Sequence, residues 1–385
     1  MIVLKHAQMI VLKHAHIYTG ENEFKDGFIR FDNRIKDIGP MDEFTPEIDD
    51  DIKDIAGAII VPGFIDVHCH GGYNYDVWNA KPQEIIKLAN LLASNEGVTS
   101  WFPTTITQSS KNIEQAMVNI RKAHDKTKII QGIHLEGPYI SRKFKGAQPE
   151  QYIRDPDINE FKRWIDASGK LVKLITIAPE LSGAREFEDF CILNNIVPSG
   201  GHSDATREEM KKSHVAHITH LYNAQRGMRH REPGVAGHAL LEENINTEII
   251  ADGFHVWPDM IKLAYELKGP HHMELVTDAM RAKGMPEGKY DLGGQTVTVQ
   301  NGQARIPAGN LAGSVLKFNQ AFINIIKFTG CSINDAVQMA SVNQAQEFGL
   351  ESKGTLEIGK DADMNILDGQ LNLLNTYSYG QKMKK

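Results

Sequence analysis

The chain has 385 residues and a formal net charge of −7, with 42 Lys and Arg against 49 Asp and Glu. Its hydrophobic content of 41% with 24% charged residues is typical of a globular protein and argues against disorder as the main state. The acidic balance argues against binding to nucleic acid or to an anionic membrane, because phosphate groups would be repelled. No run reaches 18 apolar residues, so we expect no transmembrane helix.

Two further features concern the cellular setting. The three cysteines, Cys69, Cys191 and Cys331, lie far apart, which excludes a disulfide framework and favours a reducing cytoplasm. The segment MIVLKHA occurs twice, at residues 1–7 and 9–15. We interpret this repeat as an artefact of the N-terminus, and we expect the native chain to start near Met9 and only one copy to pair in a sheet. Lys5 and His6 interrupt the apolar stretch, so we expect no signal peptide.

Residues 9–60 predict short strands separated by turns. The patterns at residues 11–18, 27–32 and 34–38 alternate or are β-branched, with Asp32-Asn33 as a hairpin turn. From residue 64 the pattern changes to strands that alternate with helices. Eight apolar runs predict strands at residues 64–67, 98–102, 129–135, 171–177, 196–197, 216–221, 248–251 and 274–276. Helical patterns lie between most of them, for example at residues 82–95, 112–124 and 258–268.

Eight strand–helix units predict a parallel barrel rather than an open doubly wound sheet. A Gly-rich β-like insert follows at residues 290–306, then two helices at 316–328 and 333–348, and then strand-and-turn patterns at 354–367. We therefore predict the α/β class, with a (β/α)8 TIM barrel over residues 63–351 and a β insert at about residues 287–308. Residues 1–62 and 352–385 are expected to form a small β-sandwich domain together.

Polar side chains recur at the carboxyl ends of five predicted strands, where a barrel enzyme has its active site. They are His68, His70, Glu136, His202, His220 and Asp278. Because side chains alternate along a strand, His68 and His70 point the same way while Cys69 points away. A single His pair or strand-end carboxylate is usually structural, so the prediction depends on the repetition at five strand ends. Imidazole and carboxylate donors in this number predict two divalent metal ions, Zn or Fe, with Mn or Co as alternatives.

Sequence motifs extend this interpretation. PGFIDVHCHG resembles the opening of the amidohydrolase superfamily, and GTLEIGKDAD resembles its C-terminal β-domain signature. GIHLEGPYI, GGHSDAT, THLYNAQ, REPGVAG, ADGFHV, LVTDAM and LAGS are similar to the N-acetylglucosamine-6-phosphate deacetylase family. The resemblance runs in order from about residue 9 to about residue 367. It implies metal-dependent hydrolysis of the N-acetyl group of N-acetylglucosamine 6-phosphate to glucosamine 6-phosphate and acetate.

The resemblance also implies roles for individual residues. Glu136 matches the family's metal-bridging or single-site acid, His202 and His220 match its metal histidines, and Asp278 matches its catalytic acid and base. His68 and His70 place the chain with members that hold two metals. The implied role of His255 is to stabilise the oxyanion. The implied substrate contacts are Ala147, Asn223, Ala224, Arg231, Asp252, His255, Leu311, Ala312 and Gly313.

The family resemblance further implies a cytoplasmic homodimer in which Arg231 reaches the neighbouring subunit's site and binds phosphate. Residues 225–230 depart from common members, so Arg226 or Arg229 could share this task. A surface pairing of Arg231 with Glu232 is the structural alternative. Two other functions stay open: a metal-dependent amidohydrolase that acts on a cyclic amide or a base, and a non-catalytic barrel that binds a sugar phosphate.

Overall fold

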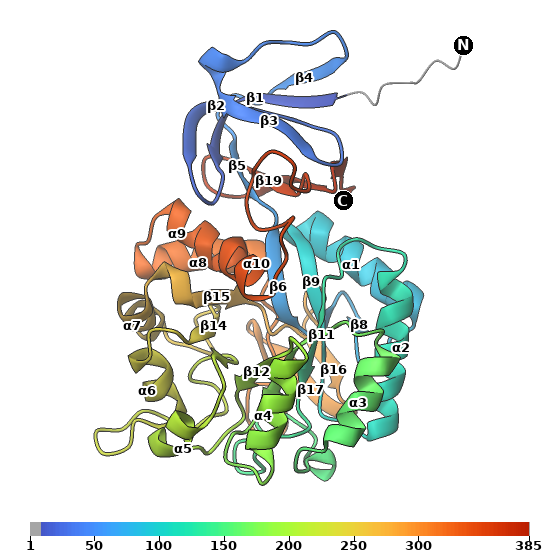
Figure 1. The fold of residues 1–385 in the computed structure, drawn as a ribbon, viewed down its shortest axis with the longest axis vertical. Helices are drawn as coiled ribbons and strands as arrows, with labels where there is room; N and C mark the ends of the chain where they lie inside the picture. Colours follow the sequence, from blue (N-terminus) through green and yellow to red (C-terminus); the bar gives the residue numbers. More distant parts are fainter. Residues whose placement is uncertain (1–8, 385) are drawn as a thin grey trace.

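The computed structural model describes residues 9–384, and its centre is a parallel barrel of eight strands (Figure 1). Each strand pairs with the next: β6 (Phe64–Cys69), β9 (Val98–Thr105), β10 (Ile133–Glu136), β11 (Val172–Ile177), β12 (Val197–Gly200), β13 (His217–Ile218), β14 (Asn246–Ile250) and β15 (Met273–Val276). A bridge between Cys69 and Ala279 joins the first strand to the end of the last. The predicted barrel and its eight strands are confirmed.

Helices surround the barrel, as Figure 1 shows. They are α1 (Pro82–Glu96), α2 (Ser110–His124), α3 (Ile158–Ala167), α4 (Ala184–Leu193), α5 (Arg207–Lys212), α6 (Gly234–Leu241), α7 (Pro258–Lys268) and α8 (Phe318–Thr329). Local signals set their ends: α1 has Pro82 as its first residue and ends at Gly97, whose φ of +79° suits glycine. None of the helices within residues 9–384 is long and apolar enough to cross a bilayer.

The predicted helix at residues 333–348 is interrupted. It consists of α9 (Ile333–Val337), a π-helical segment (Gln338–Val342) and α10 (Asn343–Glu347). Within the wider turn, Ser341 is buried and its hydroxyl donates to the carbonyl of Gly63 (3.0 Å). This contact with a distant segment accompanies the irregularity, which the apolar periodicity alone could not indicate.

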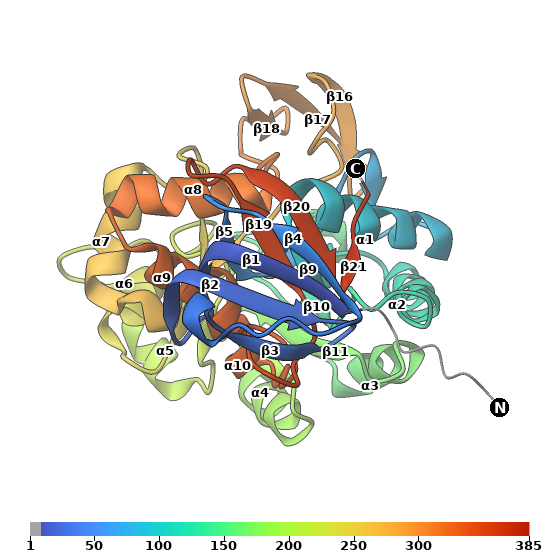
Figure 2. The ribbon, with the colours of Figure 1, turned by 90° about the horizontal axis from the view of Figure 1, so that it is seen from above.

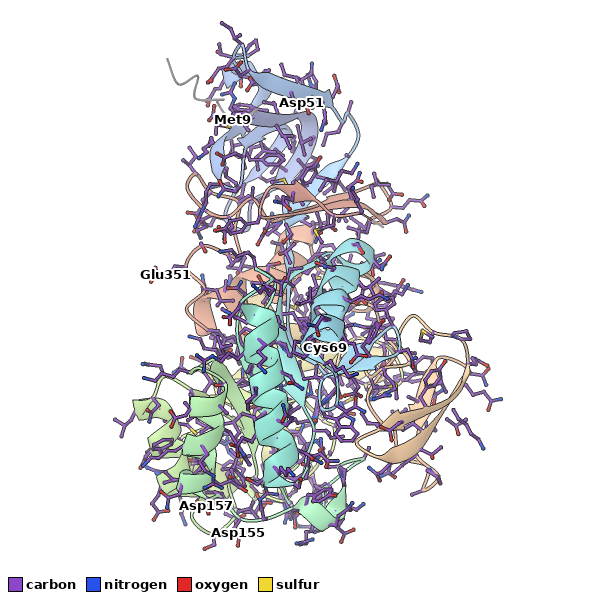
Figure 3. All side chains as sticks on the ribbon, turned by 90° about the vertical axis from the view of Figure 1, so that its right-hand side faces the viewer. Met9, Asp51, Cys69, Asp155, Asp157 and Glu351 are labelled. Atoms are coloured by element: carbon purple, nitrogen blue, oxygen red, sulfur yellow. The ribbon has the colours of Figure 1, made fainter. Side chains whose placement is uncertain are left out.

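A second sheet joins the two ends of the described chain. It contains β1 (Met9–Tyr18), β2 (Glu23–Phe31), β3 (Ile35–Pro40), β4 (Asp50–Asp54), β5 (Ile59–Pro62), β19 (Met364–Leu367), β20 (Leu373–Ser378) and β21 (Gln381–Lys382). The second MIVLKHA copy therefore pairs in the sheet as β1, while residues 1–7 lie outside the described residues. Met9 and Asp51 lie together in this sheet (Figure 3), where β1 runs parallel to β4.

This sheet lies across the end of the barrel at which β6 begins (Figure 2). It has its own apolar core, which includes Ile17, Ile29, Phe31, Ile60 and Met364. We propose domain boundaries near residues 62 and 352. The insert forms a three-stranded antiparallel sheet of β16 (Gly288–Leu292), β17 (Gln295–Gln300) and β18 (Gln303–Arg305), which projects to one side of the barrel (Figure 2).

Candidate active site

A cavity of about 470 Å³ lies at the carboxyl ends of the barrel strands, away from the small sheet. Most of the predicted site residues line it: His70, Glu136, Ala147, Asn223, Ala224, His202, His220, His255, Asp278, Leu311 and Gly313. The fold therefore gathers side chains from six strand ends and from the loop after the insert.

The carboxylate of Glu136 lies at the centre of the site. The Nε2 atoms of His202 and His220 are each 3.0 Å from its Oε1, and Nε2 of His70 is 3.1 Å from its Oε2. All four side chains are buried. Imidazole nitrogens and carboxylate oxygens are the atoms that commonly bind divalent metals, so Glu136 can belong to two sets of donors.

Asp278 faces the same cluster from the end of β15. Its Oδ1 lies 3.2 Å from Nε2 of His70 and 3.4 Å from Nε2 of His68. Burial opposes ionisation, but the charge of the His68 ring and a hydrogen bond from His70 lower the pKa of Asp278 below its usual value. The group is therefore a carboxylate at neutral pH, and it can accept a proton.

Contacts at Nδ1 fix the orientation of the His68 and His202 rings. Nδ1 of His68 lies 2.7 Å from Oε2 of Glu248, and Nδ1 of His202 lies 2.9 Å from the carbonyl oxygen of Phe144. A proton on each Nδ1 leaves the Nε2 lone pairs aimed at Glu136. Nε2 of His68 is buried and has no hydrogen-bond partner among residues 9–384.

These observations fit a divalent cation. The buried Nε2 lone pair of His68 has no donor within the described part of the chain, and several imidazole nitrogens lie close to one carboxylate. This arrangement is destabilising unless a positive charge lies between these groups. Four sets of donors among the described residues meet the spacing that an ion requires, and two of them contain Glu136: His68, His70 and Glu136, and Glu136, His202 and His220. Cys69 stays outside both sets, with Sγ 3.3 Å from the carbonyl oxygen of Gly71, as strand alternation predicted.

Three side chains of the site are carried by residues with positive φ. His202, His220 and Asp278 have φ angles of +47°, +31° and +46°, values that side chains with a Cβ rarely adopt. Such conformations persist where the surrounding structure holds them, and they are common at functional sites.

His255 and Asp252 form a pair at the rim. Nδ1 of His255 lies 2.6 Å from Oδ2 of Asp252, whose Oδ1 accepts hydrogen bonds from the backbone N–H groups of Phe254 and His255 (both 2.8 Å). His255 lines the cavity, whereas Asp252 lies behind it. Ala312 is also behind the lining: it is fully buried, and its N–H donates to the carbonyl of Ala304 (2.9 Å).

The structure does not place Arg231 in the cavity of its own chain. It lies in an exposed loop, with Nη1 2.7 Å from Nε2 of His230. Glu232, the predicted alternative partner, instead accepts hydrogen bonds from the backbone N–H groups of Arg207 and Gly234. Arg226 forms an ion pair with Asp204 (2.8 Å).

Four residues at or next to the site were not predicted. The side-chain amide of Gln148 donates to Oε2 of Glu136 (2.6 Å), and Lys143 and Arg305 line the cavity. Glu248 supports His68 from the barrel interior. Gln148 and Lys143 follow the HLEGP motif in a loop without periodicity, so no pattern in the sequence distinguished them.

Comparison with known proteins agrees with this geometry. The model of the amidohydrolase family matches residues 59–384. The chain belongs to the amidohydrolase family. It is 38% identical over 388 residues to an N-acetylglucosamine-6-phosphate deacetylase of Bacillus subtilis, with 97% of each chain covered. It is 33% identical to an N-acetylgalactosamine-6-phosphate deacetylase of Escherichia coli, with 96% of this chain and 98% of that chain covered.

A solved structure of this amidohydrolase family provides a comparison of the fold. It is a mutant N-acetyl-D-glucosamine-6-phosphate deacetylase of Mycobacterium smegmatis in complex with N-acetyl-D-glucosamine-6-phosphate. The two structures agree with a TM-score of 0.93 at 29% identity, covering 98% of this chain and 100% of that chain. The resemblance seen in the motifs is thus confirmed across the chain.

Proposed function

We propose that this chain hydrolyses the N-acetyl group of N-acetylglucosamine 6-phosphate, giving glucosamine 6-phosphate and acetate. The observation that carries the proposal is the convergence of four imidazole rings and two carboxylates in one cavity at the strand ends. The 38% identity to a deacetylase of that sugar phosphate supports the choice of substrate.

The metal ligands in this proposal are His68, His70, Glu136, His202, His220 and Asp278. We propose that the site would hold two ions, because Glu136 belongs to two sets of donors, one with His68 and His70 and one with His202 and His220. Zn or Fe suits this donor set, and Mn or Co is the alternative. A bound divalent ion supplies water of lowered pKa and polarises the acetyl carbonyl.

The chain's own residues move the protons. Asp278 accepts a proton at its carboxylate from the attacking water and then donates it to the departing sugar nitrogen. His255 presents Nε2 to the cavity and stabilises the oxyanion, while the contact of Nδ1 with Asp252 holds the ring in this orientation.

Substrate binding involves the rim of the cavity. In this proposal Asn223 and Ala224, which lie beyond β13 and line the cavity, bind the phosphate. Ala147, Leu311 and Gly313 line the cavity, and Ala312 is buried beneath this lining. We propose a cytoplasmic homodimer in which Arg231 binds the phosphate of the neighbouring subunit's substrate, since it is exposed and does not line the cavity of its own chain.

The test compares acetate release from the phosphorylated sugar, the unphosphorylated sugar, the galactose epimer and a cyclic amide. We expect release from N-acetylglucosamine 6-phosphate and far less without the phosphate. The galactose epimer is included because one relative is named for it. Metal-loaded protein that binds the sugar phosphate but releases no acetate would favour a binding protein, and activity on the cyclic amide alone would favour another amidohydrolase.

A further inference from the structure

A row of buried acidic and histidine side chains leads from the candidate metal site into the barrel. Nδ1 of His68 is 2.7 Å from Oε2 of Glu248, and Oε1 of Glu248 is 3.3 Å from Nε2 of His217. Nδ1 of His217 is in turn 3.0 Å from Oε2 of Glu347. The side chains of His68, Glu248 and His217 are 0% exposed, and that of Glu347 is 10% exposed.

Glu248 contacts two of the proposed metal ligands. Its Oε2 faces the ring of His68 and also accepts a hydrogen bond from the backbone N–H of His220 (3.0 Å). His220 has the strained φ of +31°, which needs support from its surroundings. A single carboxylate on β14 therefore holds one ligand by its ring and another by its backbone.

The rest of the row holds Glu248 in place. His217 lies between Glu248 and Glu347; burial opposes its protonation, but the two carboxylates raise its pKa well above the usual value. The ring can thus donate from both nitrogens, which leaves neither free for an ion. Glu274, which lies beside Glu347, has no hydrogen-bond donor among residues 9–384 for either carboxyl oxygen, and its burial and the charge of Glu347 raise its pKa well above the usual value.

We propose that Glu248 and His217 are positioning residues that set the metal affinity of the site. Glu248 keeps the proton of His68 on Nδ1, so that the Nε2 lone pair points at the cavity, and it fixes the backbone of His220. His217, anchored by Glu347, keeps Glu248 in the required orientation. Neither Glu248 nor His217 takes part in the proposed chemistry, and the inference rests on the metal-dependent function proposed above.

The experiment compares Glu248→Gln and His217→Gln with Glu188→Gln. The control removes a carboxylate that is equally buried but lies on α4 and accepts hydrogen bonds from Ser213 and from the N–H of His214. Zinc affinity is measured by competition with a chelator, and the zinc-dependent rise in Tm is recorded for each protein. A merely structural residue would change the Tm of the metal-free protein but not this rise.

We expect Glu248→Gln to weaken zinc binding by about 10- to 100-fold. His217→Gln should act in the same direction by less, and excess zinc should restore its activity. Glu188→Gln should keep the wild-type affinity. The inference is overturned if Glu248→Gln and His217→Gln both keep the wild-type zinc affinity, or if Glu188→Gln loses as much affinity as they do. If Glu248→Gln fails to fold, His217→Gln alone decides the test. Wild-type protein that binds none of zinc, iron, manganese and cobalt would contradict the proposed function itself.

Discussion

Asp278 is held by contacts on both sides of its peptide unit. Its N–H donates to the carbonyl of His68 (2.8 Å), and its carbonyl accepts from the N–H of Ser314 (2.7 Å). These bonds stabilise the positive φ that turns the carboxylate into the cavity. Asp278→Asn keeps the shape but cannot accept a proton, so kcat should fall by about 10² or more while KM changes little. Steady-state kinetics at verified metal content would test this, and near-normal turnover would remove Asp278 from the mechanism.

The paired histidines after β6 allow a second test at the same scale. Replacing His68 by Gln and His70 by Asn removes two donors from one set but leaves Glu136, His202 and His220 intact. Metal content per subunit should therefore fall by about one equivalent, measured by elemental analysis. If the double variant retains its full metal content, these histidines are not ligands.

Sequence patterns predicted the candidate metal ligands but not the residues that hold these ligands in position. His68 and His70 were foreseeable because alternation along a strand places both on one face. Glu248 could not be predicted in the same way, because a glutamate at the start of an apolar strand is usually expected to face solvent. Its role depends on His68 and His217, which lie 180 and 31 residues away in sequence. Only the closed barrel brings these groups together.

At the scale of elements, a buried ion pair ties α1 to the segment after β15. Nζ of Lys283 lies 3.0 Å from Oε2 of Glu96, and both side chains are 0% exposed. Glu96 also accepts hydrogen bonds from the hydroxyl of Tyr73 (2.9 Å) and the N–H of Phe318 (3.0 Å). Glu96→Gln leaves the lysine without its counter-charge, so the free energy of unfolding should fall by about 3–5 kcal/mol.

Urea denaturation measures this loss. Glu208→Gln is the matched control, because Glu208 pairs with Lys211 in the exposed part of α5 and surface pairs contribute little. Equal unfolding free energies for Glu96→Gln and the wild type would show that the buried pair does not stabilise the fold.

The insert brings a cation to the active site. Arg305 on β18 lines the cavity, and its guanidinium donates to Gln303 and to the carbonyl of Gly309. No carboxylate among residues 9–384 forms an ion pair with it, so its charge is available to an anionic ligand. We expect Arg305→Ala to raise KM for the phosphorylated sugar by about tenfold.

The unphosphorylated sugar should be little affected by Arg305→Ala. Lys289→Ala is the control, since Lys289 is exposed on β16 of the same insert and does not line the cavity. An equal rise in KM for both sugars would mean that Arg305 does not bind the phosphate.

Local patterns predicted most elements, because strand and helix periodicities reflect burial on one face. The predicted strand at residues 129–135 begins only at Ile133. Before it, Ile130 forms an isolated bridge with Trp101, whose N–H donates to the carbonyl of Ile129 (2.7 Å). The pairing of β5 with β19 joins segments about 300 residues apart, and no local pattern specifies such a partner.

At the scale of the whole molecule, Arg231 is exposed and does not line its own cavity, so the proposed homodimer assigns it to the neighbouring subunit's site. Arg231→Ala should weaken binding of the phosphorylated sugar, because a planar guanidinium pairs with phosphate through two bonds. Mixing Arg231→Ala subunits with Asp278→Asn subunits should restore part of the activity, since one site of each hybrid dimer regains both residues. If subunits exchange and no activity returns, the arginine acts within its own chain.

The proposed function is tested most directly by acetate release from N-acetylglucosamine 6-phosphate, measured with the purified wild-type protein before and after a chelator removes its metal. The metal-loaded protein should release acetate and glucosamine 6-phosphate in equal amounts. Chelation should abolish this activity, and added zinc or iron should restore it. Activity that survives complete metal removal, or metal-loaded protein that releases no acetate, would contradict the proposed function.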